Sequence, residues 1–193
     1  DKPMNVANHL VRAGLARGER PAVARGGTVL LSYSQLADNA ARIAGALRNT
    51  FGLEPGDRVG LAMKNCAEFL EILYGCWHAG LVAVPINAKL HKSEFAYILE
   101  NSGTRLSFAT CELTETIASL QDGQLERVIE VGDDEYRSVL GAESIPCVTR
   151  APQDPAWLFY TSGTTGRPKG AVLSHRNLLA AIFCYFADMD QGA

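Results

Sequence analysis

The sequence predicts an α/β fold: a doubly wound, mostly parallel sheet flanked by helices, with a β-hairpin near the N-terminus. Strand and helix patterns alternate three times between residues 57 and 131 with short connections, which is typical of a sheet wrapped by crossover helices. Residues 81–86 are continuously apolar, as expected where both faces of a parallel strand are covered. The composition, 47% hydrophobic and 20% charged over 193 residues, is that of an ordinary globular protein that can bury a core.

The N-terminal elements come first. Apolar residues at loose helical spacing predict a helix over 6–15, and two short strands around Gly26 and Gly27 predict a hairpin. A second helix follows, with Ser34 as its N-cap and an end near Gly52. Its buried stripe would consist of five apolar residues at helical spacing, Leu36, Ala40, Ile43, Ala44 and Leu47.

The alternating region comes next. Its predicted strands span 59–63, 81–86, 106–109 and 128–131. The first two intervening helices would begin at Asn65 and Ser93 as N-caps and end at Gly80 and Gly103, and the third would span 113–120. Cys76 and the neighbouring Trp77 are expected in the core.

Residues 132–156 interrupt this alternation of strands and helices. They are polar and end in the run APQDP, so they predict a connection between two units, residues 1–150 and residues 151–193. The acidic triplet at 133–135 is expected to be a solvated turn. The second unit would contain strands at 157–160 and 171–173 and a helix from Ser174. Because that unit is too small for a core of its own, it should pack on the first unit or on a partner.

Charge and cysteine usage exclude several classes of protein. The net charge of −3 argues against a nucleic-acid partner, and no apolar stretch is long enough to predict a transmembrane segment. The first residues do not resemble a signal peptide. Five cysteines without a CxxC pair, and four histidines without metal-ligand spacing, indicate free thiols in a reducing cytoplasm.

The most informative segment is YTSGTTGRPKG, residues 160–170, which lies between two predicted strands. Glycines let backbone N–H groups approach an anion, hydroxyls donate hydrogen bonds, and lysine adds positive charge. The candidate phosphate-binding residues are Thr161, Ser162, Gly163, Thr164, Thr165, Gly166 and Lys169. The spacing fits neither a Walker A loop nor the Rossmann G-x-G-x-x-G. The alternative from composition alone is an inert hairpin loop whose Ser and Thr merely suit turns.

The order of residues in this segment resembles the phosphate-binding motif of the adenylate-forming superfamily, which includes acyl- and aryl-CoA synthetases, peptide-synthetase adenylation domains and luciferases. Residues 158–169 match its twelve-position pattern without a mismatch. Two weaker family motifs precede it in the correct order, LSYSQL at 31–36 and HAGLVAVPIN at 78–87. The resemblance therefore covers nearly the whole chain, as the N-terminal part of such an enzyme.

Within the superfamily, Asn87, the pair Thr164-Thr165 and the run SHRN at 174–177 favour an acyl-CoA synthetase of the long-chain fatty acid type. The resemblance implies ATP, Mg²⁺ and CoA as reactants with a carboxylic acid, and an acyl-adenylate intermediate. It also implies that the segment from Thr161 to Gly166 binds the β- and γ-phosphates, that Thr164 is a Mg²⁺ ligand, and that Lys169 pairs with phosphate.

The resemblance assigns no catalytic residue to this chain, because family members continue for several hundred residues beyond this motif. We therefore expect the chain alone to be inactive in adenylate formation. Two alternatives stay open, a peptide-synthetase adenylation domain and a stand-alone module that binds ATP or pyrophosphate. His175 is expected to position backbone or substrate, and Arg167 to be exposed. The apolar run at 182–186 would leave a patch that favours a homo-oligomer.

Overall fold

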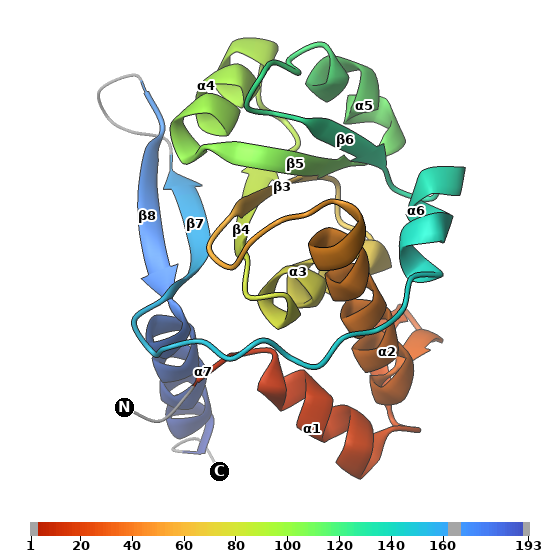
Figure 1. Cartoon of the computed structure of the whole chain (residues 1–193). Helices are drawn as coiled ribbons and strands as arrows, with labels where there is room; N and C mark the ends of the chain where they lie inside the picture. The colour runs from red at the N-terminus through yellow and green to blue at the C-terminus, as the bar shows by residue number, and fades with distance from the viewer. Residues whose placement is uncertain (1–3, 162–166, 191–193) are drawn as a thin grey trace.

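The fold is a six-stranded sheet with helices on both faces and a two-stranded hairpin beside it. It is seen in a computed structural model that describes residues 4–161 and 167–190, with side chains through residue 184 (Figure 1). The strands are β1 (Pro21–Arg25), β2 (Thr28–Ser32), β3 (Arg58–Met63), β4 (Val82–Asn87), β5 (Thr104–Ala109), β6 (Arg127–Glu130), β7 (Pro155–Thr161) and β8 (Lys169–Ser174). The helices are α1 (Asn8–Arg17), α2 (Tyr33–Gly45), the π-helical turn η1 (Ala46–Thr50), α3 (Ala67–His78), α4 (Lys92–Ser102), α5 (Cys111–Ala118), α6 (Asp134–Leu140) and α7 (His175–Asp190).

The sheet confirms the predicted doubly wound topology. Its strand order is β6-β5-β3-β4-β7-β8, and every pair is parallel except β7 with β8, which is antiparallel. From β3 the chain crosses to β4 on one side and then to β5 on the other. This reversal is the topological switch point at which ligands of open α/β sheets usually bind.

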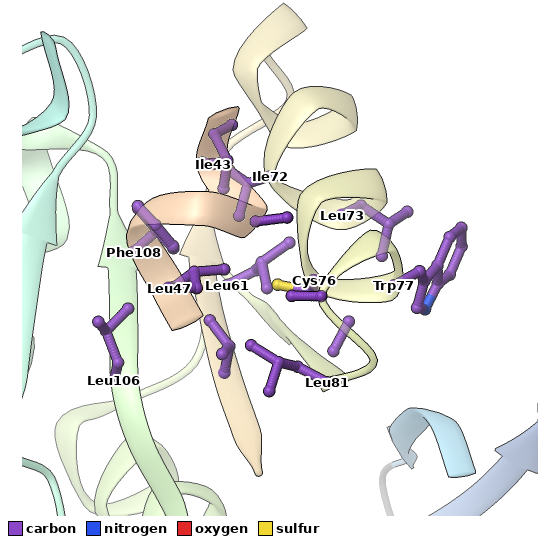
Figure 2. Packing of buried hydrophobic residues seen from close by; sticks show 14 of the residues in the cluster. Ile43, Leu47, Leu61, Ile72, Leu73, Cys76, Trp77, Leu81, Leu106 and Phe108 are labelled. Carbon is purple, nitrogen blue, oxygen red and sulfur yellow. The ribbon is translucent and has the colours of Figure 1, made fainter. Parts of the chain in front are cut away.

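Two apolar cores separate the sheet from its helices. On one face α2, α3 and α6 cover sheet residues that include Leu61 and Phe108, and on the other face α4 and α5 cover sheet residues that include Ala62 and Ala109. Figure 1 shows these two helical layers, and Figure 2 shows the packing of the first core. Cys76 and Trp77 lie in that core, as predicted.

The predicted hairpin is confirmed: β1 and β2 pair in antiparallel fashion. The predicted cap of the following helix is wrong, because Ser32 and not Ser34 occupies the N-cap. The Gln35 backbone N–H donates to Ser32 Oγ at 3.3 Å, and the Ser32 N–H donates to Gln35 Oε1 at 2.9 Å. This reciprocal pair is a capping box. The Ser34 hydroxyl instead donates to the carbonyl of Gly18 at 3.1 Å.

The predicted caps of the next two helices are also wrong. Cys66 and not Asn65 precedes α3, and His91 and not Ser93 precedes α4. At α4 the Glu94 carboxylate accepts the His91 backbone N–H at 2.9 Å. Capping therefore depends on backbone geometry that residue type alone does not specify.

We expect Ser32→Ala to lower the free energy of unfolding by about 1 kcal/mol, because an N-cap hydroxyl satisfies a helix N–H that otherwise has no partner. The matched control is Ser93→Ala, which removes an exposed hydroxyl and should change stability by less than about 0.5 kcal/mol. Urea denaturation of both variants measures the difference. Equal losses would refute the assignment of Ser32 as the cap.

The connection at residues 132–156 is more structured than predicted. Asp133 caps the short helix α6 by accepting the Tyr136 backbone N–H at 2.7 Å, so the acidic triplet is not simply a turn. After α6 the chain is held along the first unit by backbone hydrogen bonds. Val148 N–H donates to the carbonyl of His78 at 2.8 Å, and Met4 N–H donates to that of Arg150 at 2.7 Å.

The last elements pack on the rest of the molecule, since β7 and β8 belong to the same sheet as β3–β6. The division at residue 150 therefore stays a prediction about subdomains. On α7, Ile182 and Phe183 are 41% and 66% exposed, which agrees with the apolar patch expected there. Within the described residues, no helix is both long and apolar enough to cross a membrane.

Candidate functional site

The candidate site lies at the end of the β7–β8 hairpin. Thr161 is the last residue of β7 and Lys169 the first residue of β8, and the antiparallel register places them directly opposite each other. Both residues are exposed. The predicted loop thus joins two neighbouring antiparallel strands.

The remaining predicted phosphate-binding residues, Ser162, Gly163, Thr164, Thr165 and Gly166, lie outside the described residues. Arg167 is exposed, as expected, and its guanidinium lies over the Tyr97 ring of α4, 5.6 Å from the ring centroid. Among the described residues no cluster of three or more His, Cys, Asp or Glu side chains could hold a metal ion. Of the predicted site residues, the structure therefore brings Thr161 and Lys169 together.

A hollow of about 730 Å³ opens beside this hairpin. It lies at the carboxyl ends of β3 and β4 and is bounded by Phe159 and Tyr160 of β7. The other lining residues are Met63, Lys64, Asn65, Phe69, Pro85, Ile86, Asn87, Ala88 and Lys89. The hollow thus lies outside the carboxyl ends of parallel strands, where open α/β sheets usually bind small molecules.

Two lysines at the hollow were not predicted as site residues. Lys64 follows β3 and forms an ion pair with Glu112 at 2.6 Å, which lowers the pKa of that carboxyl to about 2. Lys89 follows β4 and forms no ion pair with a described residue. The sequence signal that could have identified these lysines is that each follows a predicted parallel strand, because the carboxyl ends of such strands meet at one edge of the sheet.

His175 lies at the junction of β8 and α7 and is fully buried. Its Nδ1 accepts the Val6 backbone N–H at 3.1 Å, and its own backbone N–H donates to the carbonyl of Asp154 at 3.1 Å. The pKa of His175 is lowered to about 4, chiefly because burial disfavours the imidazolium and also because Arg150 lies nearby. The ring therefore positions backbone, one of the two roles expected for it.

This lowered pKa predicts a loss of stability in acid. The unfolded chain binds a proton at His175 near pH 6.5 and the folded chain only near pH 4. The unfolding free energy should therefore decrease as pH falls from 6.5 to 4, by on the order of 3 kcal/mol from this group. Urea denaturation at pH 7 and pH 4 should show a smaller decrease for His175→Asn. If the variant loses as much stability on acidification as the wild type does, the prediction is wrong.

Comparison with known proteins connects this geometry to a family. The model of the AMP-binding enzyme family matches residues 7–192. A feruloyl-CoA synthase from Amycolatopsis sp is 41% identical over 161 residues, which cover 81% of this chain and 30% of that protein. The fatty acid–[acyl-carrier-protein] ligase ScoC from Streptomyces coeruleorubidus is 39% identical, over 78% of this chain and 29% of its own length.

A solved structure has the same fold. The inhibitor-bound N-terminal domain of FACL13 from Mycobacterium tuberculosis superposes with a TM-score of 0.80 at 32% sequence identity, covering 89% of this chain and 44% of that domain. The chain spans about 30% of the length of the two relatives described above. The family match extends over nearly the whole chain and includes the β7–β8 hairpin. The chain therefore belongs to the family of AMP-binding enzymes.

Proposed function

We propose that this chain is the N-terminal, phosphate-binding part of an ATP-dependent acyl-CoA synthetase. The observation that carries the proposal is the hairpin in which Thr161 faces Lys169, next to an open hollow at the carboxyl edge of the sheet. A cytoplasmic location is part of the proposal and agrees with five free cysteines.

In the proposed reaction, the carboxylate of the substrate attacks the α-phosphorus of ATP. The bond to the bridging oxygen breaks, pyrophosphate leaves with its electron pair, and the thiol of CoA later displaces AMP to form the thioester. Negative charge accumulates on the leaving pyrophosphate, so donors oriented toward it stabilise the transition state. Lys169 and the segment from Thr161 to Gly166 would supply those donors.

Mg²⁺ would be bound through the triphosphate and Thr164. A hydroxyl oxygen is a ligand type that this hard cation accepts, and bound Mg²⁺ would neutralise part of the phosphate charge. The described residues contain no carboxylate cluster that would hold the ion without nucleotide. The proposed binding of Mg²⁺ to this chain is therefore dependent on ATP.

The similarity to ScoC, a fatty acid–[acyl-carrier-protein] ligase, favours a second candidate function. In that case the thiol that accepts the acyl group would be carried by a protein instead of CoA. The first half-reaction would be unchanged, and the role proposed for Lys169 would be the same. The two candidates differ in the acceptor, so transfer of an acyl group from the adenylate to CoA or to a carrier protein distinguishes them.

Calorimetric titration of the chain with ATP tests the proposal. We expect weak binding that requires Mg²⁺ and is abolished in Lys169→Ala and in Thr164→Ala. The matched control is Arg25→Ala, which removes one exposed positive charge from the N-terminal hairpin and should bind ATP as the wild type does. Binding that is equal in wild type and Lys169→Ala would contradict the role proposed for the hairpin.

A further inference from the structure

Helix α4 contacts the β7–β8 hairpin on both sides of the connecting loop. On the β7 side, the Tyr160 hydroxyl donates to Asn101 Oδ1 at 2.7 Å. On the β8 side, the guanidinium of Arg167 lies over the Tyr97 ring. Tyr97 and Asn101 are four residues apart, so they lie on one face of α4. Figure 1 shows α4 next to the ends of β7 and β8.

On the β7 side, the packing around Tyr160 directs its hydroxyl toward α4. Tyr160 pairs in register with Gly170 across the hairpin. A Cβ at position 170 would lie 3.0 Å from Tyr160 Cζ, so the glycine leaves room for the phenol ring to lie across β8. Tyr160 and Tyr97 both pack against the apolar core under α4. The ring is therefore held over the hairpin while its hydroxyl reaches the helix.

On the β8 side, Arg167 has no competing partner among the described residues. It forms no ion pair with any described carboxylate. Its guanidinium lies over the Tyr97 ring. A cation over an aromatic face is attracted by the ring quadrupole. Arg167 precedes Lys169 by two residues. A contact that fixes the position of Arg167 therefore also restricts the position of Lys169 at the start of β8.

We propose that α4 anchors the phosphate-binding hairpin, with Asn101 and Tyr97 as positioning residues that hold Tyr160 and Arg167 at its two ends. The name phosphate-binding rests on the proposed function, whereas the two contacts do not. Because α4 also packs against β4 and β5 through its apolar face, the anchor couples the position of Lys169 to the edge of the hollow. Loss of either contact should loosen the end of the hairpin without unfolding the sheet.

Amide hydrogen exchange of the free chain tests the anchor on the Arg167 side. Tyr97→Leu and Arg167→Gln should each speed exchange at Thr161 and Lys169 about two- to fivefold, and the double variant should be no faster than either single variant. Tyr97→Phe keeps the ring and should exchange as the wild type does. Purely additive effects, or Tyr97→Phe as fast as Tyr97→Leu, would overturn this half of the proposal.

The same cycle with Asn101→Ala and Tyr160→Phe tests the other side, with an expected increase of about two- to tenfold for each single variant. Exchange at Leu61 in the central strand should stay unchanged in all variants, which separates local loosening from global unfolding. Arg167→Gln alters an exposed side chain, so the test does not depend on variants that fold poorly. Unchanged exchange at Thr161 and Lys169 in that variant would refute the Arg167 contact.

ATP titration separates this inference from the proposed function. If the wild type binds ATP no better than Lys169→Ala, the proposed function fails, and the exchange cycles still decide whether α4 anchors the hairpin. If both hold, Tyr97→Leu should weaken ATP binding by about the same factor by which it speeds exchange, and Tyr97→Phe should not. Wild-type affinity in Tyr97→Leu would show that the anchor does not position Lys169.

Discussion

Under the proposed function, replacing Lys169 by alanine in a full-length acyl-CoA synthetase that contains this segment should slow adenylate formation about 100- to 1000-fold. The physical reason is the charge that develops on pyrophosphate as its bond to the α-phosphorus breaks, because one preoriented donor at such a site typically contributes a factor of that size. Lys169 is exposed at the start of β8 and faces Thr161. Its ammonium group is therefore available to phosphate at the proposed site.

The two half-reactions provide the sharpest measurement. Pyrophosphate release reports the first step, and thioester formation from a supplied acyl-adenylate reports the second, in which no pyrophosphate leaves. Lys169→Ala should slow the first step and leave the second near the wild-type rate, whereas Arg25→Ala should affect neither. Equal losses in both steps would indicate that Lys169 acts on the fold of the enzyme and would contradict its role toward the leaving group.

Replacing Phe108 by alanine should lower the free energy of unfolding by about 3–5 kcal/mol, the usual cost of removing a fully buried phenyl ring. Phe108 lies on β5, between Leu61 of β3 and Ile129 of β6 in the register of the sheet. It is 0% exposed, and its ring meets that of Tyr136 edge to face with centroids 6.2 Å apart. Figure 2 shows its place among the labelled core residues.

Phe183→Ala is the matched control for this prediction. It removes the same ring from a position on α7 that is 66% exposed, and it should change stability by less than about 0.5 kcal/mol. Urea denaturation of both variants, compared at constant m-value, gives the two free energies. A loss below about 1 kcal/mol for Phe108→Ala would show that the core around β5 is not packed as described.

The hydrophobic patterns identified the strands and all the α-helices except α6, but they placed several of the ends wrongly. Continuously apolar strands and helical stripes reflect burial along the chain, and burial is what drives their formation. Caps depend on which residue adopts an extended backbone before the first turn. Ser32 and Ser34 are the same residue type, and the signal that separates them is Gln35, which follows Ser32 at the spacing of a capping box, whereas Ala37 stands at that spacing from Ser34. Helix α6 was missed because it is short and polar, and Asp133 is its main local signal.

The candidate site, too, could be predicted from the sequence only in part. The segment around Lys169 could be found because its glycines, hydroxyls and lysine lie close together in the sequence. The hollow could not be delimited from the sequence, because its lining residues Lys64 and Phe159 are more than ninety residues apart in the chain. The polar contacts between Tyr160 and Asn101 and between Arg167 and Tyr97 likewise join distant segments.

By itself, the sequence determined the α/β class, the family motif and the location of the phosphate-binding candidates. The tertiary structure decided which side chains meet. Glu71 is the clearest case, since this buried carboxylate on α3 accepts hydrogen bonds from Asn39 of α2 and Tyr136 of α6, both at 2.8 Å. A local sequence pattern shows how regularly buried residues recur along one helix or strand. Contacts between elements depend on the crossing of helices and the register of strands, which are settled only when the whole core packs.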